Sequence, residues 1–226
     1  MPTRTRKSCL QAAEGATIDL ASSDVEMPPI KRRFVSSAKD TQNRHASMAA
    51  RESAGNVLVL DQGWNTVDAL LGHSIEPERI FVANNNPADY QEMRDHASEG
   101  YDEITLQFVD VAAFFDEPAN AHLQKQGFSV IDLDLCCKGE TACRVLRRVL
   151  DGKYLRMCDL TTLSVTFSTR GCRKPEVEAT IDELSDSIDM LARRRHKMRI
   201  AGVPLSTPYT ANGSSMVWTQ FKLVDL

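Results

Sequence analysis

The sequence predicts an α/β fold, in which a mostly parallel seven-stranded sheet ends in an antiparallel hairpin and carries helices on both faces. The first observation is that short apolar runs alternate with helical segments from Gly55 onward, a pattern typical of parallel strands joined by crossover helices. The second is the dipeptide Asn212-Gly213 between the last two strand-like stretches, which is a strong hairpin signal. The hairpin should therefore close the sheet.

The strands and helices are expected in regular alternation. The predicted strands cover residues 56–61, 79–83, 103–109, 128–134 and 160–167, and the hairpin covers 209–223. The predicted helices cover residues 66–72, 88–99, a short segment through Phe114 and Phe115, 141–150, and a long amphipathic stretch over 175–199. Near-continuous apolar runs such as Asn56-Val57-Leu58-Val59-Leu60-Asp61 favour strands that are buried on both faces.

Length and composition suit one core. The chain has 226 residues, is 42% hydrophobic and has a formal net charge of −4. No apolar run approaches the roughly 18 residues that a membrane-spanning helix needs, and the N-terminus lacks the apolar stretch of a secretory signal. We therefore expect an intracellular protein, cytoplasmic or nuclear, without a membrane partner.

Cysteine usage gives no sign of a metal site. There is no CxxC pair and no Cys/His cluster at zinc spacing, so no metal is expected. Two cysteines are adjacent and most lie in apolar segments, which favours reduced, buried thiols over disulfides. The six are Cys9, Cys136, Cys137, Cys143, Cys158 and Cys172.

The first 55 residues differ from the rest. They carry nine Lys/Arg and six Asp/Glu, which leaves 18 basic and 25 acidic groups in the other 171 residues. No hydrophobic period persists in them, so residues 1–55 are predicted to be a disordered basic leader and residues 56–226 the folded domain. Lys31-Arg32-Arg33 is either a nuclear-import or phosphate-binding patch or a solvated charge run.

The first strand is followed by a loop with a recognisable pattern. Its residues are Asp61-Gln62-Gly63-Trp64-Asn65. Together with the closing hairpin, this loop resembles the D/E-x-G-x-G loop of the class I S-adenosylmethionine-dependent methyltransferase superfamily, over about residues 55–226. The resemblance implies a Rossmann-like fold and S-adenosylmethionine as cofactor, with Asp61, Gly63 and Asn65 beside it. Asn65 replaces the second glycine, and we expect it to keep the turn because Asn tolerates left-handed backbone angles.

The next two strands also end in polar residues. Asn84 and Asn85 stand where the family has an acid that binds the ribose, and Asp110 matches the residue that meets the adenine amino group. Ligands of open α/β sheets bind at the carboxyl ends of the strands, so the resemblance places these residues in one cofactor site. For each Asp, capping of the following helix is the alternative.

The fourth strand carries the candidate catalytic residues. Its sequence Ile131-Asp132-Leu133-Asp134 is most similar to the fourth motif of the tRNA guanine dimethyltransferases, in which an acid orients or deprotonates an exocyclic amine. By this resemblance Asp134 is the candidate general base or amine acceptor, and Asp132 supports it or points to the opposite face. Two carboxylates two residues apart on a strand share one face, so at least one should be hydrogen-bonded or have a raised pKa.

Two further features allow more than one interpretation. Cys136 and Cys137 lie where cytosine C5-methyltransferases place their nucleophile, but a buried thiol in a packed loop is the preferred interpretation. Arg170, after the fifth strand, could contact a phosphate or the cofactor carboxylate, or it could pair with Asp132 or Asp134.

The expected partner is a nucleic acid. Arg193, Arg194, Arg195 and Lys197 gather at the end of the long helix, and with the leader they form a basic surface. The helix dipole alone would also favour cations there. The predicted function is methyl transfer to a nucleic-acid base nitrogen, with a partner subunit as a further expectation. The alternatives are a catalytically inactive methyltransferase-fold binding or scaffold subunit, and another Rossmann-like nucleotide-binding enzyme.

Overall fold

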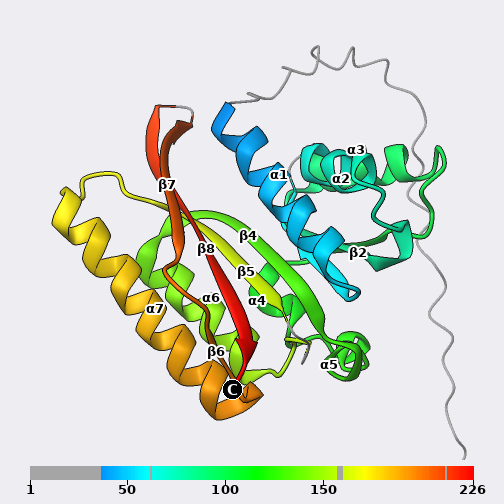
Figure 1. Cartoon of the computed structure of the whole chain (residues 1–226). Coiled ribbons are helices and arrows are strands. Elements are labelled where there is room, and N and C mark those ends of the chain that lie inside the picture. The colour runs from blue at the N-terminus through cyan, green and yellow to red at the C-terminus, as the bar shows by residue number, and fades with distance from the viewer. Residues whose placement is uncertain (1–36, 62, 157–159, 212) are drawn as a thin grey trace, which may run out of the picture. The chain divides into compact units, whose positions relative to one another are not determined.

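The computed structural model describes residues 37–226 except 62, 157–159 and 212. In this part of the chain an eight-stranded sheet has the order β3-β2-β1-β4-β5-β8-β6, and β7 also pairs with β8 (Figure 1). The strands are β1 (Asn56–Val59), β2 (Ile80–Asn84), β3 (Thr105–Phe108), β4 (Phe128–Lys138), β5 (Thr161–Ser168), β6 (Met198–Ile200), β7 (Leu205–Ala211) and β8 (Ser214–Asp225).

The pairing confirms the predicted parallel sheet closed by a hairpin. Strands β1 to β5 pair in parallel, whereas β8 runs antiparallel to β5, β6 and β7. Ala211 pairs with Ser214, so the predicted two-residue turn joins β7 to β8, and Gly213 has φ +73°. Asn212 lies outside the described residues. The sequence missed β6 because the strand has only three residues, which lie inside the predicted end of the long helix.

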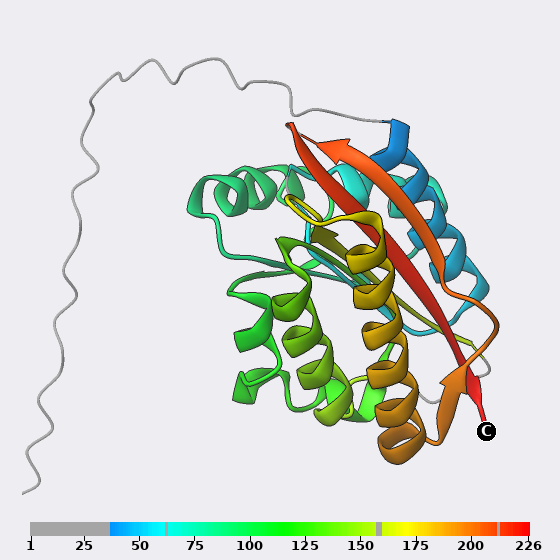
Figure 2. The same cartoon turned by 90° about the vertical axis from the view of Figure 1, so that its left-hand side faces the viewer.

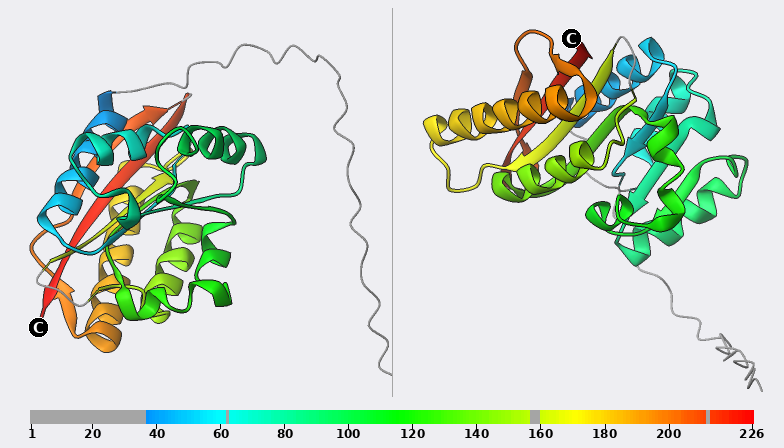
Figure 3. Two further views of the ribbon diagram at one scale, coloured as in Figure 1. Left: turned by 90° about the vertical axis from the view of Figure 1, so that its right-hand side faces the viewer. Right: turned by 90° about the horizontal axis from the view of Figure 1, so that it is seen from below.

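Helices cover both faces of the sheet, as predicted. They are α1 (Ser37–Glu52), α2 (Asn65–Gly72), α3 (Pro87–Ala97), α4 (Val111–Phe114), α5 (Leu123–Gln126), α6 (Gly139–Asp151) and α7 (Lys174–His196). Two short 3₁₀ helices, η1 (Pro77–Arg79) and η2 (Pro118–Asn120), complete the set. Figure 2 shows α6 and α7 in front of the sheet, and the left view of Figure 3 shows α1, α2 and α3 over the opposite face. None of the described helices has the length and apolar character needed to span a membrane.

Each face of the sheet has its own apolar core. Val57, Val59 and Val130 point toward α1, α2 and α3. The alternate residues, such as Leu58 and Ile131, point toward α4, α6 and α7. Because side chains alternate along a strand, the continuous apolar runs of β1 and β4 supply both cores.

Helix α1 corrects the predicted domain boundary. Residues 37–52 are helical and pack against α2, β4 and β5, so the disordered leader predicted for residues 1–55 is wrong for this segment. The helix buries only small or polar side chains, which gave no hydrophobic period in the sequence. Its buried residues are Gln42, Asn43, Ala46, Ser47, Ala49 and Ala50. The rest of the predicted leader, with Lys31-Arg32-Arg33, lies outside the described residues.

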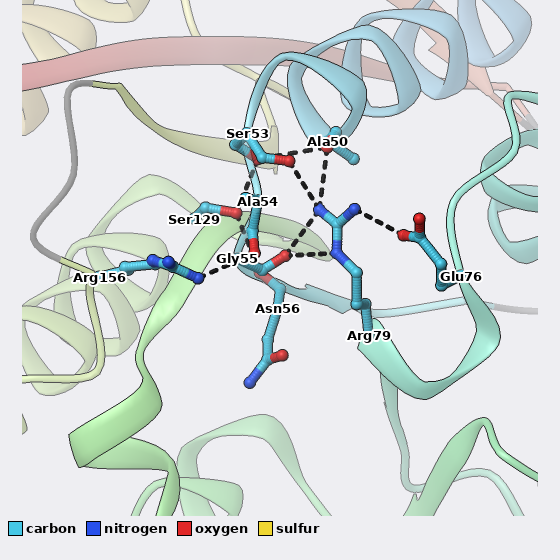
Figure 4. A network of polar contacts seen from close by, with 9 residues as sticks. All are labelled: Ala50, Ser53, Ala54, Gly55, Asn56, Glu76, Arg79, Ser129 and Arg156. Carbon is cyan, nitrogen blue, oxygen red and sulfur yellow. Dashed lines mark hydrogen bonds and ion pairs between the residues drawn. The ribbon is translucent and has the colours of Figure 1, made fainter.

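A guanidinium group fastens the end of α1 to the sheet (Figure 4). Arg79 donates to the carbonyl oxygens of Ala50 (3.0 Å), Ser53 (2.8 Å) and Gly55 (2.8 Å), and it also pairs with Glu76 (2.8 Å). The last carbonyls of a helix have no partner within the helix, and Arg79 supplies one for them. This clamp sets the direction in which the chain leaves α1 and enters β1.

The face of β4, β5 and β8 that lies under α1 is polar. Asp132 is in register with Ser164, and Ser164 with Gln220, so the three side chains form a row across the sheet. Asp134, Thr166 and Trp218 form the next row. The His45 ring of α1 lies 5.5 Å from the Trp218 ring. The polar side chains that α1 buries therefore match a polar surface of the sheet.

Candidate functional site

The loop after β1 holds the start of α2. The buried Asp61 carboxylate accepts hydrogen bonds from the backbone N–H groups of Thr66 (2.8 Å) and Val67 (2.9 Å). Asp61 thus makes the capping contacts that the sequence offered as the alternative to cofactor binding. Gly63 has φ +86°, as a tight loop requires.

The expectation for Asn65 is wrong. Asn65 is the first residue of α2, and the left-handed conformation falls on Trp64, with φ 70° and ψ 1°. A bulky residue in this region costs about 1–2 kcal/mol. The buried Trp64 ring packs against His96 (5.1 Å between centroids) and Tyr101 (6.4 Å), and this packing offsets the cost. Trp64 therefore belongs to the core beneath α2 and α3.

The polar residues that follow β2 and β3 form hydrogen bonds with adjacent parts of the protein. Asn84 donates to the backbone carbonyl of Asp61 (2.7 Å) and accepts from the backbone N–H of Asn86 (2.6 Å). It therefore ties the end of β2 to the end of β1. The exposed Asn85 donates to the Asp110 carboxylate (3.4 Å), which also accepts from the N–H of Ala112 (2.8 Å) at the start of α4.

These strand ends surround one small cavity. It has a volume of about 130 Å³ and is lined by Leu60, Asp61, Ala83, Asn84, Asn85, Val109, Asp110, Val111, Asp134 and Leu135. A neighbouring cavity of about 410 Å³, between α4 and α6, shares Asp110, Val111 and Leu135 with it, and the two form one cleft. Five of the residues predicted to form the site meet here. Gly63, Asn65 and Asp132 are not among its described lining residues.

An irregularity in β4 shapes the cleft. Asp134 is in register with Thr166, and the next β4 residue in register with β5 is Cys137, which pairs with Phe167. Leu135 and residue 136 are therefore extra residues in β4, which is the arrangement of a bulge. Leu135 lines both halves of the cleft as a result. The sequence predicted that β4 ends at Asp134 and did not anticipate this bulge.

Asp134 has a partner that the sequence did not suggest. The Lys39 Nζ of α1 lies 2.9 Å from the Asp134 Oδ2, and the two side chains are 19% and 20% exposed. Burial alone would lower the pKa of Lys39, but the charges of Asp134, Asp132 and Asp61 outweigh it and raise that pKa. Lys39 is therefore a permanent cation among three carboxylates. Nothing in the composition of residues 37–52 distinguished it from the other charges of the leader.

Asp132 lies under α1 on the same face of the sheet as Asp134, so of the two alternatives given for it, the one in which it points to the opposite face does not hold. Its side chain is buried, with 3% of its surface exposed. Burial raises its pKa to about 6, and the charges of Asp134 and Asp61 add to the shift, while the Lys39 ammonium and the Trp218 N–H act in the opposite direction. The sequence predicted a raised pKa or a hydrogen bond for at least one of Asp132 and Asp134, and the raised pKa of Asp132 agrees with that prediction.

Three more polar side chains adjoin the carboxylates. The Gln42 amide and the Trp218 Nε1 are buried, and within the described residues neither makes a hydrogen bond of normal geometry. Gln42 still lies near enough to Tyr209 to favour its ionised form, although burial and the charge of Asp134 raise the pKa of Tyr209 overall. The environment of Asp132 is thus polar and closely packed.

Two further candidate residues, Cys137 and Arg170, are not placed with Asp61, Asp132 and Asp134. Burial raises the pKa of Cys137, which favours the neutral thiol over a nucleophilic thiolate. The side chain of Cys136 lies outside the described residues. Arg170 is exposed, and Lys39 occupies the place beside Asp134 that was one of the alternatives for Arg170.

The comparisons with known proteins agree with the strand order. No protein-family profile and no curated protein matches the sequence. Among solved structures, a SAM-dependent methyltransferase from Agrobacterium tumefaciens has a TM-score of 0.56 at 10% identity over 83% of this chain and 63% of that chain. The chain has the class I S-adenosylmethionine-dependent methyltransferase fold.

Two other structures show the same methyltransferase fold. A putative rRNA methylase from Clostridium thermocellum has a TM-score of 0.52 at 13% identity over 85% of this chain and 99% of that chain. TYW2 from M. jannaschii, in complex with AdoMet, has a TM-score of 0.51 at 12% identity over 86% and 80% of the two chains. This confirms the fold class that the sequence predicted.

The cleft lies at the edge of the methyltransferase fold where ligands of open α/β sheets bind. Asn85 and Asp110 supply polar groups, while Leu60, Ala83 and Leu135 supply apolar walls. Five of the ten residues that line the smaller cavity are Asp or Asn, so this part of the cleft is polar. The carboxylates of Asp61, Asp110 and Asp134 line this cleft, and their negative charge is offset by Arg144 and Arg148 in its larger part and by Lys39 beside Asp134.

Proposed function

We propose that the protein is an S-adenosylmethionine-dependent methyltransferase that acts on a base nitrogen of a nucleic acid. The observation that carries this proposal is that Asp134 lines the same cleft as Asp61, Asn85 and Asp110. A group that can orient a nucleophile thus lies beside the residues that would hold the cofactor. Positioning of this kind contributes a large part of the rate of a group transfer.

Asn85 and Asp110 are the residues best placed to hold the cofactor. Asn84 already uses its amide nitrogen and oxygen within the protein, so Asn85 is the better candidate for the ribose hydroxyls. The bound cofactor supplies an electrophilic methyl group on a positively charged sulfur. Asp61 holds the loop under this position by fixing the start of α2, and its charge also favours a cation.

Asp134 would accept a hydrogen bond from the substrate amine and so direct the nitrogen lone pair at the methyl group. An ionised carboxylate can accept up to about four hydrogen bonds, so Asp134 can hold Lys39 and an amine together. Asp132 does not line the cleft. Its role would be that of a positioning residue, because its charge helps to hold the Lys39 ammonium group beside Asp134.

The nucleic-acid part of the proposal rests on the basic residues. Arg193, Arg194, Arg195 and Lys197 are exposed at the end of α7, where the sequence placed a contact with nucleic acid. Arg193 pairs with Asp189, and Arg195 pairs with Asp151. One structural neighbour is described as a putative rRNA methylase, and its substrate class supports this part of the proposal by analogy.

A second candidate function is a catalytically inactive binding subunit. The observation that favours it is the ion pair of Lys39 with Asp134, because it occupies the candidate amine acceptor. The cavity of about 130 Å³ beside Asp134 is also smaller than the roughly 300 Å³ at which small-molecule sites begin, although it adjoins a larger one.

Isothermal titration of the full chain with S-adenosylmethionine and S-adenosylhomocysteine tests the cofactor. We expect saturable binding that Leu135→Trp abolishes, because a larger ring would fill the cleft. Leu205→Trp, at an exposed position on β7, is the matched control and should bind like the wild type. Absence of heat and of a thermal shift at millimolar cofactor would contradict the enzyme proposal.

Transfer of a labelled methyl group to mixed RNA and DNA then separates the two candidates. Asp134→Asn should retain cofactor binding and lose transfer by at least about 100-fold, the typical contribution of a positioned acid or base. Unchanged transfer in Asp134→Asn would remove the assigned role. Cofactor binding without transfer to any nucleic acid would favour the binding subunit.

A further inference from the structure

A further cavity lies at the opposite end of the sheet from the cleft. It is an open groove of about 750 Å³ at the amino ends of β1 and β4, lined by Asn56, Gln124, Lys125, Gln126, Gly127, Lys153, Leu155, Arg156, Arg195 and His196. Asn56 lines the groove and Asp61 lines the cleft, so β1 separates the two by roughly 16 Å at about 3.3 Å per residue.

The groove is strongly basic in a chain whose net charge is −4. Four cations line it, and none of its described lining residues is acidic. Asp151 pairs with Arg195 from outside the lining, which still leaves an excess of three positive charges. Burial lowers the pKa of His196, and its Nε2 donates to the Leu150 carbonyl (2.7 Å), so His196 adds no charge.

The composition of the lining argues against a small organic ligand. Pockets for such ligands are mainly apolar and aromatic, with a few polar groups. Here Leu155 is the one aliphatic side chain among the described lining residues, and none of them is Phe, Tyr or Trp. The one ring in the described lining belongs to His196, which is buried, so the groove offers bases no exposed aromatic ring for stacking. Its charges and amides suit the phosphates of a backbone, which carry no sequence information.

Two of the four cations are held in place. Arg156 donates to the carbonyl oxygen of Ala54 (2.8 Å), as Figure 4 shows, and Arg195 donates to Asp151 (3.1 Å). A Cβ on Gly127 would lie 2.6 Å from the Arg156 Cα, so the backbones of these two residues touch and form the floor of the groove. Lys125 and Lys153 are exposed and have no ion-pair partner among the described residues. The groove therefore combines two guanidinium groups that are hydrogen-bonded within the protein with two exposed ammonium groups.

We propose that this groove binds the phosphodiester backbone of a single-stranded nucleic acid without reading its sequence. The proposal deepens the proposed function, on which it rests for the identity of the substrate, because a strand held here would extend over the molecule toward the cleft. The exposed ammonium groups of Lys125 and Lys153 are open to the phosphates of such a strand. Binding itself requires neither the cofactor nor Asp134.

Fluorescence anisotropy of the full chain with a labelled 20-nucleotide oligouridylate, without cofactor, tests the proposal. The double variant Lys125→Gln/Lys153→Asn removes two charges, and Asn suits the left-handed backbone of Lys153 (φ 58°). We expect affinity at 50 mM salt to fall about tenfold or more. The slope of log affinity against log salt should fall by about 1.4, because each phosphate contact of a single strand contributes about 0.7.

The matched control is Arg94→Gln/Lys222→Gln, which removes two charges from exposed positions on α3 and β8 outside the groove. It should change affinity less than threefold. An equal loss in both double variants would overturn the groove as the principal site, as would wild-type affinity in the groove variant. Circular dichroism of each variant excludes misfolding as the cause.

Competitors identify the class of partner. A 20-base-pair duplex should compete less well than the single strand, and poly-glutamate of 20 residues should compete at least tenfold less well than either. If poly-glutamate competed as well as the single strand, and if the groove variant no longer bound poly-glutamate, the groove would be assigned to an acidic protein. That result would overturn the proposal. If the protein bound the single strand but not the cofactor, the groove would still be a nucleic-acid site, and the proposed methyltransferase activity would be refuted.

Discussion

Lys39 and Asp134 are 95 positions apart in the sequence, and their side chains meet at 2.9 Å over the carboxyl edge of the sheet. One residue comes from the first described helix and the other from the central strand β4. Since the charge of Lys39 also lowers the pKa of Asp132, the ammonium group links the partly buried carboxylate of Asp134 to the fully buried one of Asp132.

Removal of the Lys39 charge should raise the pKa of Asp132 above its value of about 6. Lys39→Met takes away the cation that stabilises the ionised carboxylate, while burial and the charge of Asp134 remain. Titration of the Asp carboxyl carbons by NMR measures the effect. Lys39→Arg keeps the charge and should leave the Asp132 pKa near 6, and an unchanged pKa in Lys39→Met would refute the electrostatic link.

The raised pKa of Asp132 should make the folded state less stable as the pH rises from about 4 to about 6. In this range the folded chain binds the proton more tightly than the unfolded chain, whose Asp has a pKa near 3.8, so deprotonation favours unfolding. The shift corresponds to about 3 kcal/mol. Above about pH 6 this contribution to the free energy of unfolding should be constant.

Thermal unfolding of the wild type and of Asp132→Asn over pH 4 to 7 checks this dependence. The difference in stability between the two proteins separates the contribution of Asp132 from that of the other carboxylates. The variant should gain stability relative to the wild type as the pH rises, and a difference that does not vary with pH would show that Asp132 does not titrate as described.

The Arg79 clamp should contribute measurably to stability. Arg79→Ala leaves the carbonyls of Ala50, Ser53 and Gly55 without the guanidinium donor, and we expect a loss of about 2–3 kcal/mol in the free energy of unfolding. Urea denaturation measures it. Hydrogen exchange should also become faster in the last turn of α1.

Two variants serve as controls for the clamp. Arg94→Ala, at an exposed position on α3, should change stability by at most about 0.5 kcal/mol. Arg79→Lys keeps the charge but lacks the fork that reaches several carbonyls, so it should recover only part of the loss. Full recovery by lysine would show that charge rather than geometry fastens α1.

The sequence predicted the central sheet well because its signals are local. The runs around Val57, Phe81 and Ile131 need only their own apolar residues to be recognised as buried strands. The same signals placed Asp61, Asp110 and Asp134 at strand ends, and these ends meet in one cleft.

The parts that escaped prediction depend on contacts between distant segments. Helix α1 packs through Gln42, Asn43 and small residues against a polar face of β4 and β5, and no apolar period could reveal it. The one local sign of this helix in the sequence is the spacing of Ala46, Ala49 and Ala50, which places these small residues on one face. The left-handed Trp64 likewise depends on His96 and Tyr101, which are more than 30 positions away.

The position of α1 along the chain has a consequence for how the protein assembles during synthesis. Helix α1 leaves the ribosome before any of the described strands, but the groups that hold it, Arg79 at one end and Asp134 at the other, follow later. With so few apolar side chains of its own, α1 has little to keep it folded until those partners exist. Lys39 therefore joins Asp134, Asp132 and Asp61 only when α1 docks onto strands that are made long after it.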